Sequence, residues 1–154
     1  MEPISFHPAA EALHVCKQNG TDVRYYLFDE CEIHLNRLAP GSVQEWHFHT
    51  QVDESILVTG GELLCRWQAQ GRTFCRTLRA GDVVRVGSTV HTLENASPAE
   101  AQFTVFRFVP QGTDRRACFL HDKTVVAAPC AEVSARPAEA FAPAANDRRG
   151  KQPA

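Results

Sequence analysis

Three histidines and one glutamate have the types and spacing needed to hold a metal ion. His47, His49 and Glu54 lie within one short stretch, and His91 follows later in the chain. Imidazole nitrogens and a carboxylate oxygen are ligands that first-row divalent metals favour. A cation shared by all four would also supply the partner that polar groups need when a fold buries them. The sequence therefore predicts a metal centre at His47, His49, Glu54 and His91.

Strand alternation explains how these side chains could meet. Side chains along a strand point to opposite faces in turn, so His47 and His49 share one face and Phe48 takes the other. Glu54 follows after a short turn, at the start of the next expected strand, and His91 opens a distant one. In a barrel the inward faces converge on one axis, and the mouth can hold one small ligand.

The rest of the chain has the pattern of many short strands. Turn signals such as Asn19-Gly20, Pro40-Gly41 and Gly60-Gly61 separate segments rich in β-branched and aromatic residues. This pattern predicts an all-β sandwich or barrel. Strands are expected at 23–28, 32–38, 44–49, 55–59, 62–68, 73–78, 83–86, 91–95 and 101–109. Short helices are expected at 8–15 and 117–126.

Two motifs give the chain a resemblance to a known superfamily. Gly41, His47, His49, Glu54 and Gly61 match the first cupin motif, G-x5-H-x-H-x(3,4)-E-x6-G. The second motif, G-x5-P-x-G-x2-H-x3-N, is matched by Gly81, His91 and Asn95. The chain departs from it at Gly87, where proline is usual, at Thr89, where glycine is usual, and by a gap one residue shorter. The chain resembles a small single-domain, cupin 2-like, metal-binding cupin.

The resemblance covers roughly 32–109 and implies a fold, a cofactor and an assembly. The fold would be a cupin jelly-roll β-barrel (a double-stranded β-helix) with a short N-terminal arm and a flexible C-terminal tail. The matched His47, His49, Glu54 and His91 would hold a divalent metal ion, with Fe(II) expected first and Mn, Zn, Ni or Cu as alternatives. Cupins of this type often form homodimers. The superfamily hosts many chemistries, so membership does not fix the substrate.

The function predicted from the site and the resemblance is a small-molecule oxidoreductase of the dioxygenase type. Four protein ligands on a six-coordinate ion leave open positions for substrate, water or dioxygen. Glu54 is the candidate catalytic residue, either as the fourth ligand or as a base that swings away. The alternatives are a metal-dependent isomerase or cyclase, and a non-catalytic cupin that binds a small ligand.

Other polar residues are weaker candidates for the site. One strand arginine facing inward could clamp a substrate carboxylate, and the candidates are Arg66, Arg85 and Arg107. His34 could line the pocket or lie on an exposed edge. Asp53 could orient a ligand histidine. The His121-Asp122 pair is expected to be a surface contact.

The domain organisation follows from composition along the 154 residues. We expect an N-terminal arm and first strand over 1–30, a barrel core over 31–110, and an extension packing on the barrel over 111–133. The segment 134–154 is dominated by alanine and proline near its start and by basic residues near its end. It has too little large apolar surface to offset the entropy of ordering, so we expect a flexible tail.

Charge and composition limit the classes of partner that the chain is expected to bind. The formal net charge is −2, which does not favour a broad electrostatic grip on nucleic acid or acidic lipid. No apolar stretch is long enough to cross a bilayer, and the N-terminus lacks a basic start followed by an apolar block. The six cysteines form no C-x-x-C pair. We therefore expect a cytoplasmic protein with reduced thiols, a small-molecule substrate or ligand, and no nucleic-acid or membrane partner.

Overall fold

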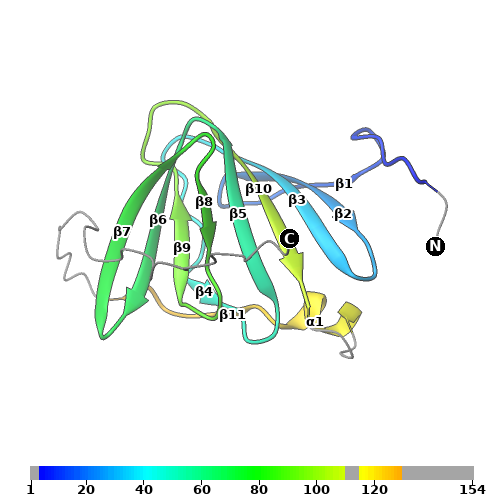
Figure 1. The fold of residues 1–154 in the computed structure, drawn as a ribbon. Helices are drawn as coiled ribbons and strands as arrows, with labels where there is room; N and C mark the ends of the chain where they lie inside the picture. Colours follow the sequence, from blue (N-terminus) through cyan, green and yellow to red (C-terminus); the bar gives the residue numbers. More distant parts are fainter. Residues whose placement is uncertain (1–3, 110–114, 130–154) are drawn as a thin grey trace, which may run out of the picture.

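Two antiparallel sheets facing each other make up the fold (Figure 1). The computed structural model describes residues 4–109 and 115–129. Its elements are β1 (Leu13–Cys16), β2 (Thr21–Leu27), β3 (Cys31–Leu38), β4 (His47–Phe48), β5 (Asp53–Gly60), β6 (Glu62–Ala69), β7 (Arg72–Arg79), β8 (Val83–Arg85), β9 (His91–Glu94), β10 (Ala101–Phe108), α1 (Arg115–His121) and β11 (Thr124–Val125). The all-β prediction is confirmed.

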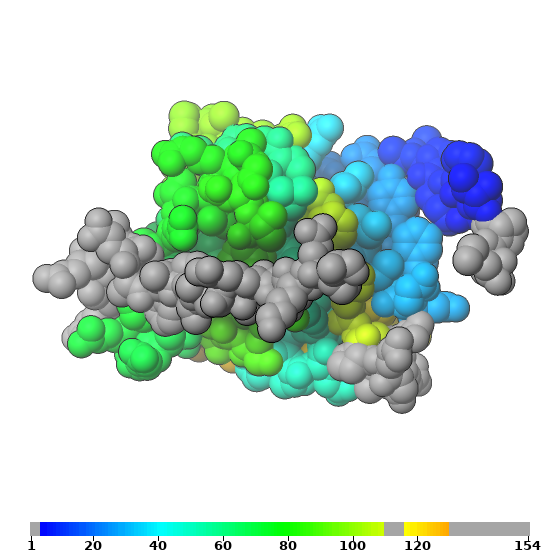
Figure 2. All heavy atoms as spheres, in the orientation of Figure 1, coloured from blue at the N-terminus to red at the C-terminus, as the bar shows by residue number. Residues whose placement is uncertain are grey.

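The strand order places the two halves of the expected metal centre in different sheets. One sheet has the order β1-β2-β3-β10-β5-β8, and the other has the order β11-β4-β9-β6-β7. Glu54 therefore comes from the first sheet, and His47 and His91 come from the second. The N-terminal residues, dark blue in Figure 2, stand at the end of the molecule beside β2 and β3.

The space between the sheets is filled by alternate side chains. On β5 the buried positions are Glu54, Ile56 and Val58, as the period of two predicts. The buried apolar cluster consists of Leu38, Ile56, Val58, Leu63, Cys65, Leu78, Val86, Leu93, Ala101, Phe103 and Val105. The interior is thus apolar along most of β5, and Glu54 is the polar member of its buried face.

Two local predictions were wrong. The helix expected at 8–15 is replaced by strand β1, which pairs with β2 through Leu13↔Tyr25 and Val15↔Val23. The strand expected at 44–49 is only His47–Phe48, so His49 lies just beyond its end. Alanine and glutamate favour a helix near residues 8–12, but pairing with a neighbouring strand decided the outcome at β1.

The segment after β10 returns to the barrel. Cys118 and Phe119 of α1 form a second buried cluster with Val52, against which Val109 packs. Strand β11 then pairs with β4. The helix expected at 117–126 is therefore α1, shifted toward the N-terminus and shortened by β11. The tail predicted at 134–154 lies outside the described residues, and no helix within the described part is long and apolar enough to cross a membrane.

Gly61 links the two sheets where β5 passes into β6. Its backbone is left-handed (φ 68°), and a Cβ there would lie 2.5 Å from the carbonyl oxygen of Glu100. Gly71 has a similar φ of 70° but open space around it. Gly71→Ala should lower the free energy of unfolding by about 1–2 kcal/mol through backbone strain alone. Gly61→Ala should cost about 1–3 kcal/mol more because of the clash.

Urea denaturation of the two glycine variants measures this difference. Equal losses of stability at Gly61 and Gly71 would show that the Glu100 backbone can move aside at little cost.

Candidate metal centre

The fold brings the four predicted ligands together. His47 on β4 lies opposite His91 on β9, and both face Glu54 on β5 across the interior. One ligand atom each of His47, His49 and Glu54 lies within 4.8 Å of the others. Nε2 of His49 is 3.4 Å and Nε2 of His91 is 3.7 Å from the Glu54 carboxylate. All four side chains are buried.

Backbone carbonyls fix the protonation of two of the rings. Nδ1 of His47 lies 2.8 Å from the carbonyl oxygen of Glu45, and Nδ1 of His91 lies 2.8 Å from that of Thr89. A carbonyl oxygen only accepts, so in each ring Nδ1 carries the hydrogen and donates it. Nε2 is then left with a free lone pair, the arrangement usual for a metal-binding histidine.

Unpartnered buried nitrogens supply the test of whether a metal ion fits. Among the described residues, both ring nitrogens of His49, Nε2 of His91 and Nε of Arg107 are buried without a hydrogen-bond partner. A buried polar group left unpaired costs about 1–3 kcal/mol. A divalent cation would accept the Nε2 lone pairs, and Glu54 would offset part of its charge. The donor set of imidazoles and one carboxylate suits Fe, Mn, Zn, Ni or Cu.

Burial and neighbouring groups keep the ligands in their metal-binding forms. Burial lowers the pKa of His47 to about 4. Burial alone would raise the pKa of Glu54, but the rings of His49 and His91 outweigh it and hold that pKa well below its usual range. At neutral pH the Glu54 carboxylate is ionised and the His47 ring is neutral, so protons do not compete with a metal there.

A row of charges crosses three neighbouring strands beside the centre. Arg107 on β10 lies in register with Glu32 on β3 and with Glu54 on β5. Its NH1 is 2.9 Å from Glu32, and its Nε is 3.5 Å from Glu54. Glu32 also contacts His34 at 2.9 Å and Arg116 at 3.2 Å. Glu32 was not among the candidates from sequence, because only the strand register shows that it shares a row with Arg107.

Comparison with known proteins identifies the architecture. No family model and no curated protein matches the chain. Many solved structures do, among them a cupin-superfamily sugar phosphate isomerase from Silicibacter pomeroyi (24% identity, TM-score 0.52, covering 59% of this chain and 60% of that one). The chain has the cupin fold.

Two further structures with this cupin fold are enzymes of other kinds. One is an oxalate oxidase in complex with the substrate analogue glycolate (22% identity, TM-score 0.57, covering 68% of this chain and 59% of that one). The other is the oxalate decarboxylase formate complex from Lactobacillus farciminis (18% identity, TM-score 0.60, covering 73% and 36%). The matches span 60% or less of these chains, and at these identities they establish the cupin fold alone.

A cavity of about 360 Å³ opens beside the centre, in the position where a cupin barrel can hold a small ligand. His47, His49, Glu54 and Arg107 line it together with apolar side chains from Leu93, Phe103, Val105 and Phe119. His34 also lines it, so that residue faces the pocket and not an exposed edge. The volume is at the lower end for ligand sites, which indicates a small molecule.

Asp122 is a site residue whose role the sequence did not indicate. Its carboxylate accepts hydrogen bonds from the backbone N–H groups of Thr50, Gln51 and Val52, at 2.7–3.1 Å, and lies 3.9 Å from Nδ1 of His49. It is buried, so the expected surface contact with His121 is wrong. Asp122 fixes the loop between His49 and Glu54 and stands where a carboxylate would orient the His49 ring.

The pH dependence of stability tests this role of Asp122. Burial would raise its pKa, but the hydrogen bonds from residues 50–52 outweigh burial and lower it. A lowered pKa means that the carboxylate stabilises the fold fully above its unfolded value of about 4 and loses this effect as the pH falls through the folded value. Asp122→Asn should therefore cost about 1–3 kcal/mol at neutral pH, and the difference from wild type should shrink below about pH 4.

Urea denaturation at several pH values measures the loss of stability in Asp122→Asn at neutral pH and its decrease in acid. The exposed neighbour serves as the control, because His121→Gln should stay within about 0.5 kcal/mol of wild type. A cost that stays constant down to acid pH would mean that the charge of Asp122 is not what holds the loop.

Two of the candidate arginines do not face the cavity. Arg66 pairs with Glu94 at 2.8 Å, and Arg85 pairs with Asp53 at 2.9 Å. Asp53 is the first residue of β5, so it points away from Glu54, and it is engaged by Arg85. Of the three strand arginines, Arg107 is the one directed into the cavity.

The altered turn of the second cupin motif still places His91 opposite His47. Gly87 adopts a left-handed backbone (φ 53°), and Thr89 N–H bonds to the carbonyl of Val86. After this turn, Nδ1 of the His91 ring is hydrogen-bonded to the carbonyl oxygen of Thr89. Asn95 is fully buried and donates to the carbonyls of Leu38 and Ala99, so its role is to tie loops together.

Proposed function

We propose that this chain is a metal-dependent enzyme that oxidises a small organic acid with dioxygen. The observation that carries the proposal is the set of unpartnered ring nitrogens of His49 and His91, which lie 3.4 and 3.7 Å from Glu54. His49 and Glu54 line a cavity of about 360 Å³. A purely structural buried cluster would be expected to satisfy these atoms.

The roles of the residues follow from their contacts. His47, His49 and His91 would hold a divalent ion through Nε2, and Glu54 would be the fourth ligand. A redox-active ion such as Fe(II) would supply Lewis acidity and one-electron chemistry toward dioxygen. Glu54 also lines the cavity, so a substrate bound there would lie beside its carboxylate.

The charges around the cavity favour an anionic substrate. Arg107 lies in its wall, and Lys17, Arg116 and Lys123 also line it, against the carboxylates of Glu32, Glu45 and Glu54. A divalent cation added to this set would leave the cavity with an excess of positive charge. An organic acid small enough for the cavity would balance it, and an arginine fork can bind a carboxylate through two hydrogen bonds.

The comparisons support this substrate class without establishing it. Two of the structures with the same fold are described with oxalate, glycolate or formate, all of which are small carboxylates. The Silicibacter pomeroyi protein, described as a sugar phosphate isomerase, shows that the fold also serves an anionic substrate without net oxidation.

Oxygen uptake by the Fe(II)-loaded protein tests the proposal. A panel of small carboxylic acids, phenols and thiols is added in turn, with oxygen consumption and product analysis as readouts. We expect uptake that depends on an organic acid and disappears in His49→Ala. In Arg116→Gln, which alters the mouth of the cavity and leaves the metal centre intact, the KM for the acid should rise with kcat little changed.

The same experiment separates the alternatives. Conversion of a substrate without oxygen uptake would favour a Lewis-acid isomerase or cyclase. Binding of a ligand with no conversion under any metal would favour a non-catalytic cupin. Either result would overturn the proposed oxidation while leaving the metal centre in place.

A further inference from the structure

A second group of metal-ligating side chains lies on β1 and β2, outside the cavity. Nε2 of His14 is 2.9 Å from Oδ1 of Asp22 and 3.7 Å from Sγ of Cys16. Sγ of Cys16 is in turn 3.7 Å from Oδ2 of Asp22. The proposed enzyme function makes no use of these three residues.

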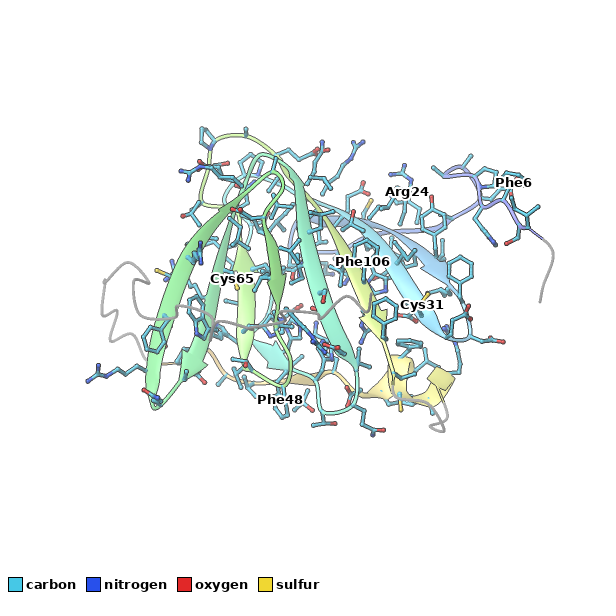
Figure 3. The ribbon with its side chains drawn as sticks, in the orientation of Figure 1. Phe6, Arg24, Cys31, Phe48, Cys65 and Phe106 are labelled. Carbon is cyan, nitrogen blue, oxygen red and sulfur yellow. The ribbon has the colours of Figure 1, made fainter. Side chains whose placement is uncertain are left out.

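Strand geometry builds this cluster. His14 and Cys16 are two residues apart on β1, so their side chains share one face. Asp22 stands directly opposite Cys16 in the β1–β2 register. The alternate residues of β1, Leu13 and Val15, take the other face, and Leu13 lines the cavity. The cluster therefore occupies the outer face of the sheet, at the end of the molecule where Figure 3 shows Arg24.

The distances between the ligand atoms are close to those around a tetrahedrally coordinated metal ion. Zinc–nitrogen and zinc–oxygen bonds of about 2.0–2.1 Å and zinc–sulfur bonds of about 2.3 Å place tetrahedral ligand atoms about 3.3–3.6 Å apart. The observed distances lie close to this range: 3.7 Å between His14 and Cys16, 2.9 Å from His14 to one carboxylate oxygen of Asp22, and 3.7 Å from Cys16 to the other. A single ion between them would need only small side-chain movements.

We propose that His14, Cys16 and Asp22 form a second metal site, on the surface, for Zn²⁺ or an ion of similar preference. Imidazole, thiolate and carboxylate are the three ligand types that zinc takes in proteins, and water would complete the coordination.

The surroundings indicate a weaker site than the one in the barrel. His14 and Asp22 are 43% and 38% exposed, so solvent screens the site. NH1 of Arg24 lies 4.0 Å from Asp22 and repels a cation. A bound ion would join edge strand β1 to β2 and so hold Leu13 in the cavity wall.

Cobalt(II) distinguishes the two sites because it gives a charge-transfer absorption band when a sulfur atom is among its ligands. The barrel centre offers only nitrogen and oxygen ligands, so cobalt there gives no sulfur-to-metal charge-transfer band. Titration of the full chain with Co²⁺ should produce this band as a second equivalent binds. Added Zn²⁺ should displace the cobalt and remove the band.

Matched variants test the assignment. Cys16→Ser and His14→Ala should remove or greatly reduce the band while the urea unfolding transition stays close to that of wild type, which shows that the chain is folded. Cys75→Ser removes a different half-buried strand thiol and should leave the band unchanged. Absence of the band at saturating Co²⁺, or its persistence in Cys16→Ser, would overturn the proposal. Neither outcome depends on metal in the barrel centre.

Discussion

Glu54→Gln is expected to weaken binding of a divalent ion at the barrel centre by at least about 100-fold, beyond the 10–100-fold typical of residues that only support a ligand. The substitution keeps the size of the side chain and removes its charge. Glu54 is the one carboxylate within 4 Å of both His49 and His91 in the described structure, so no other anion there can balance the cation. Competition with a chromophoric chelator measures the affinity directly.

The thermal stability of the same variant gives an independent readout. A ligand that binds only the folded state raises stability by RT ln(1 + [L]/Kd). Wild type should therefore show a rise in Tm with added metal that Glu54→Gln loses. Glu62→Gln is the matched control, because Glu62 is exposed and pairs with Arg79 away from the centre. Unchanged affinity in Glu54→Gln would remove Glu54 from the ligand set.

Arg107→Leu is expected to lower the free energy of unfolding by about 3–5 kcal/mol, the cost of removing one partner from a buried ion pair. Arg107 and Glu32 are 8% and 4% exposed, and their charged groups are 2.9 Å apart. Without the guanidinium, the partners of Glu32 within the described residues are the His34 ring and the half-exposed Arg116. Urea denaturation of the metal-free protein measures the loss.

Two further variants show whether charge burial is the cause. Arg66→Leu removes a strand arginine from a more exposed pair with Glu94 and should cost no more than about 1 kcal/mol. The double variant Glu32→Leu/Arg107→Leu should recover part of the stability lost in Arg107→Leu, because it also removes the buried Glu32 carboxylate that had lost its partner. If Arg107→Leu lost as little stability as Arg66→Leu, burial of the ion pair between Arg107 and Glu32 would not be what stabilises the fold there.

The convergence of the four side chains could be predicted from sequence because they lie on strands or, for His49, directly after one. Alternation fixes the shared face of His47 and His49, and the turn that follows returns the chain at Glu54. His91 needed the superfamily motif as well, since nothing local links it to the others. The all-β fold was predictable for the same reason, from regularly spaced turn signals between β-forming segments.

The residues that complete the site were not predictable because they depend on pairing between distant strands. The Glu32–Arg107–Glu54 row exists only through the register of β10 with β3 and β5. Asp122 reaches Val52 across 70 residues of chain. Strand β1 was mistaken for a helix because its four residues form a strand by pairing with β2, which local composition does not reveal.

The most direct test is anomalous X-ray diffraction from crystals of the metal-loaded protein. We predict one strong anomalous peak between the two sheets, at about 2.0–2.2 Å from Nε2 of His47, His49 and His91 and from a carboxylate oxygen of Glu54. A well-ordered structure from metal-saturated protein with no peak at that position, or with those rings turned away from one another, would contradict the account.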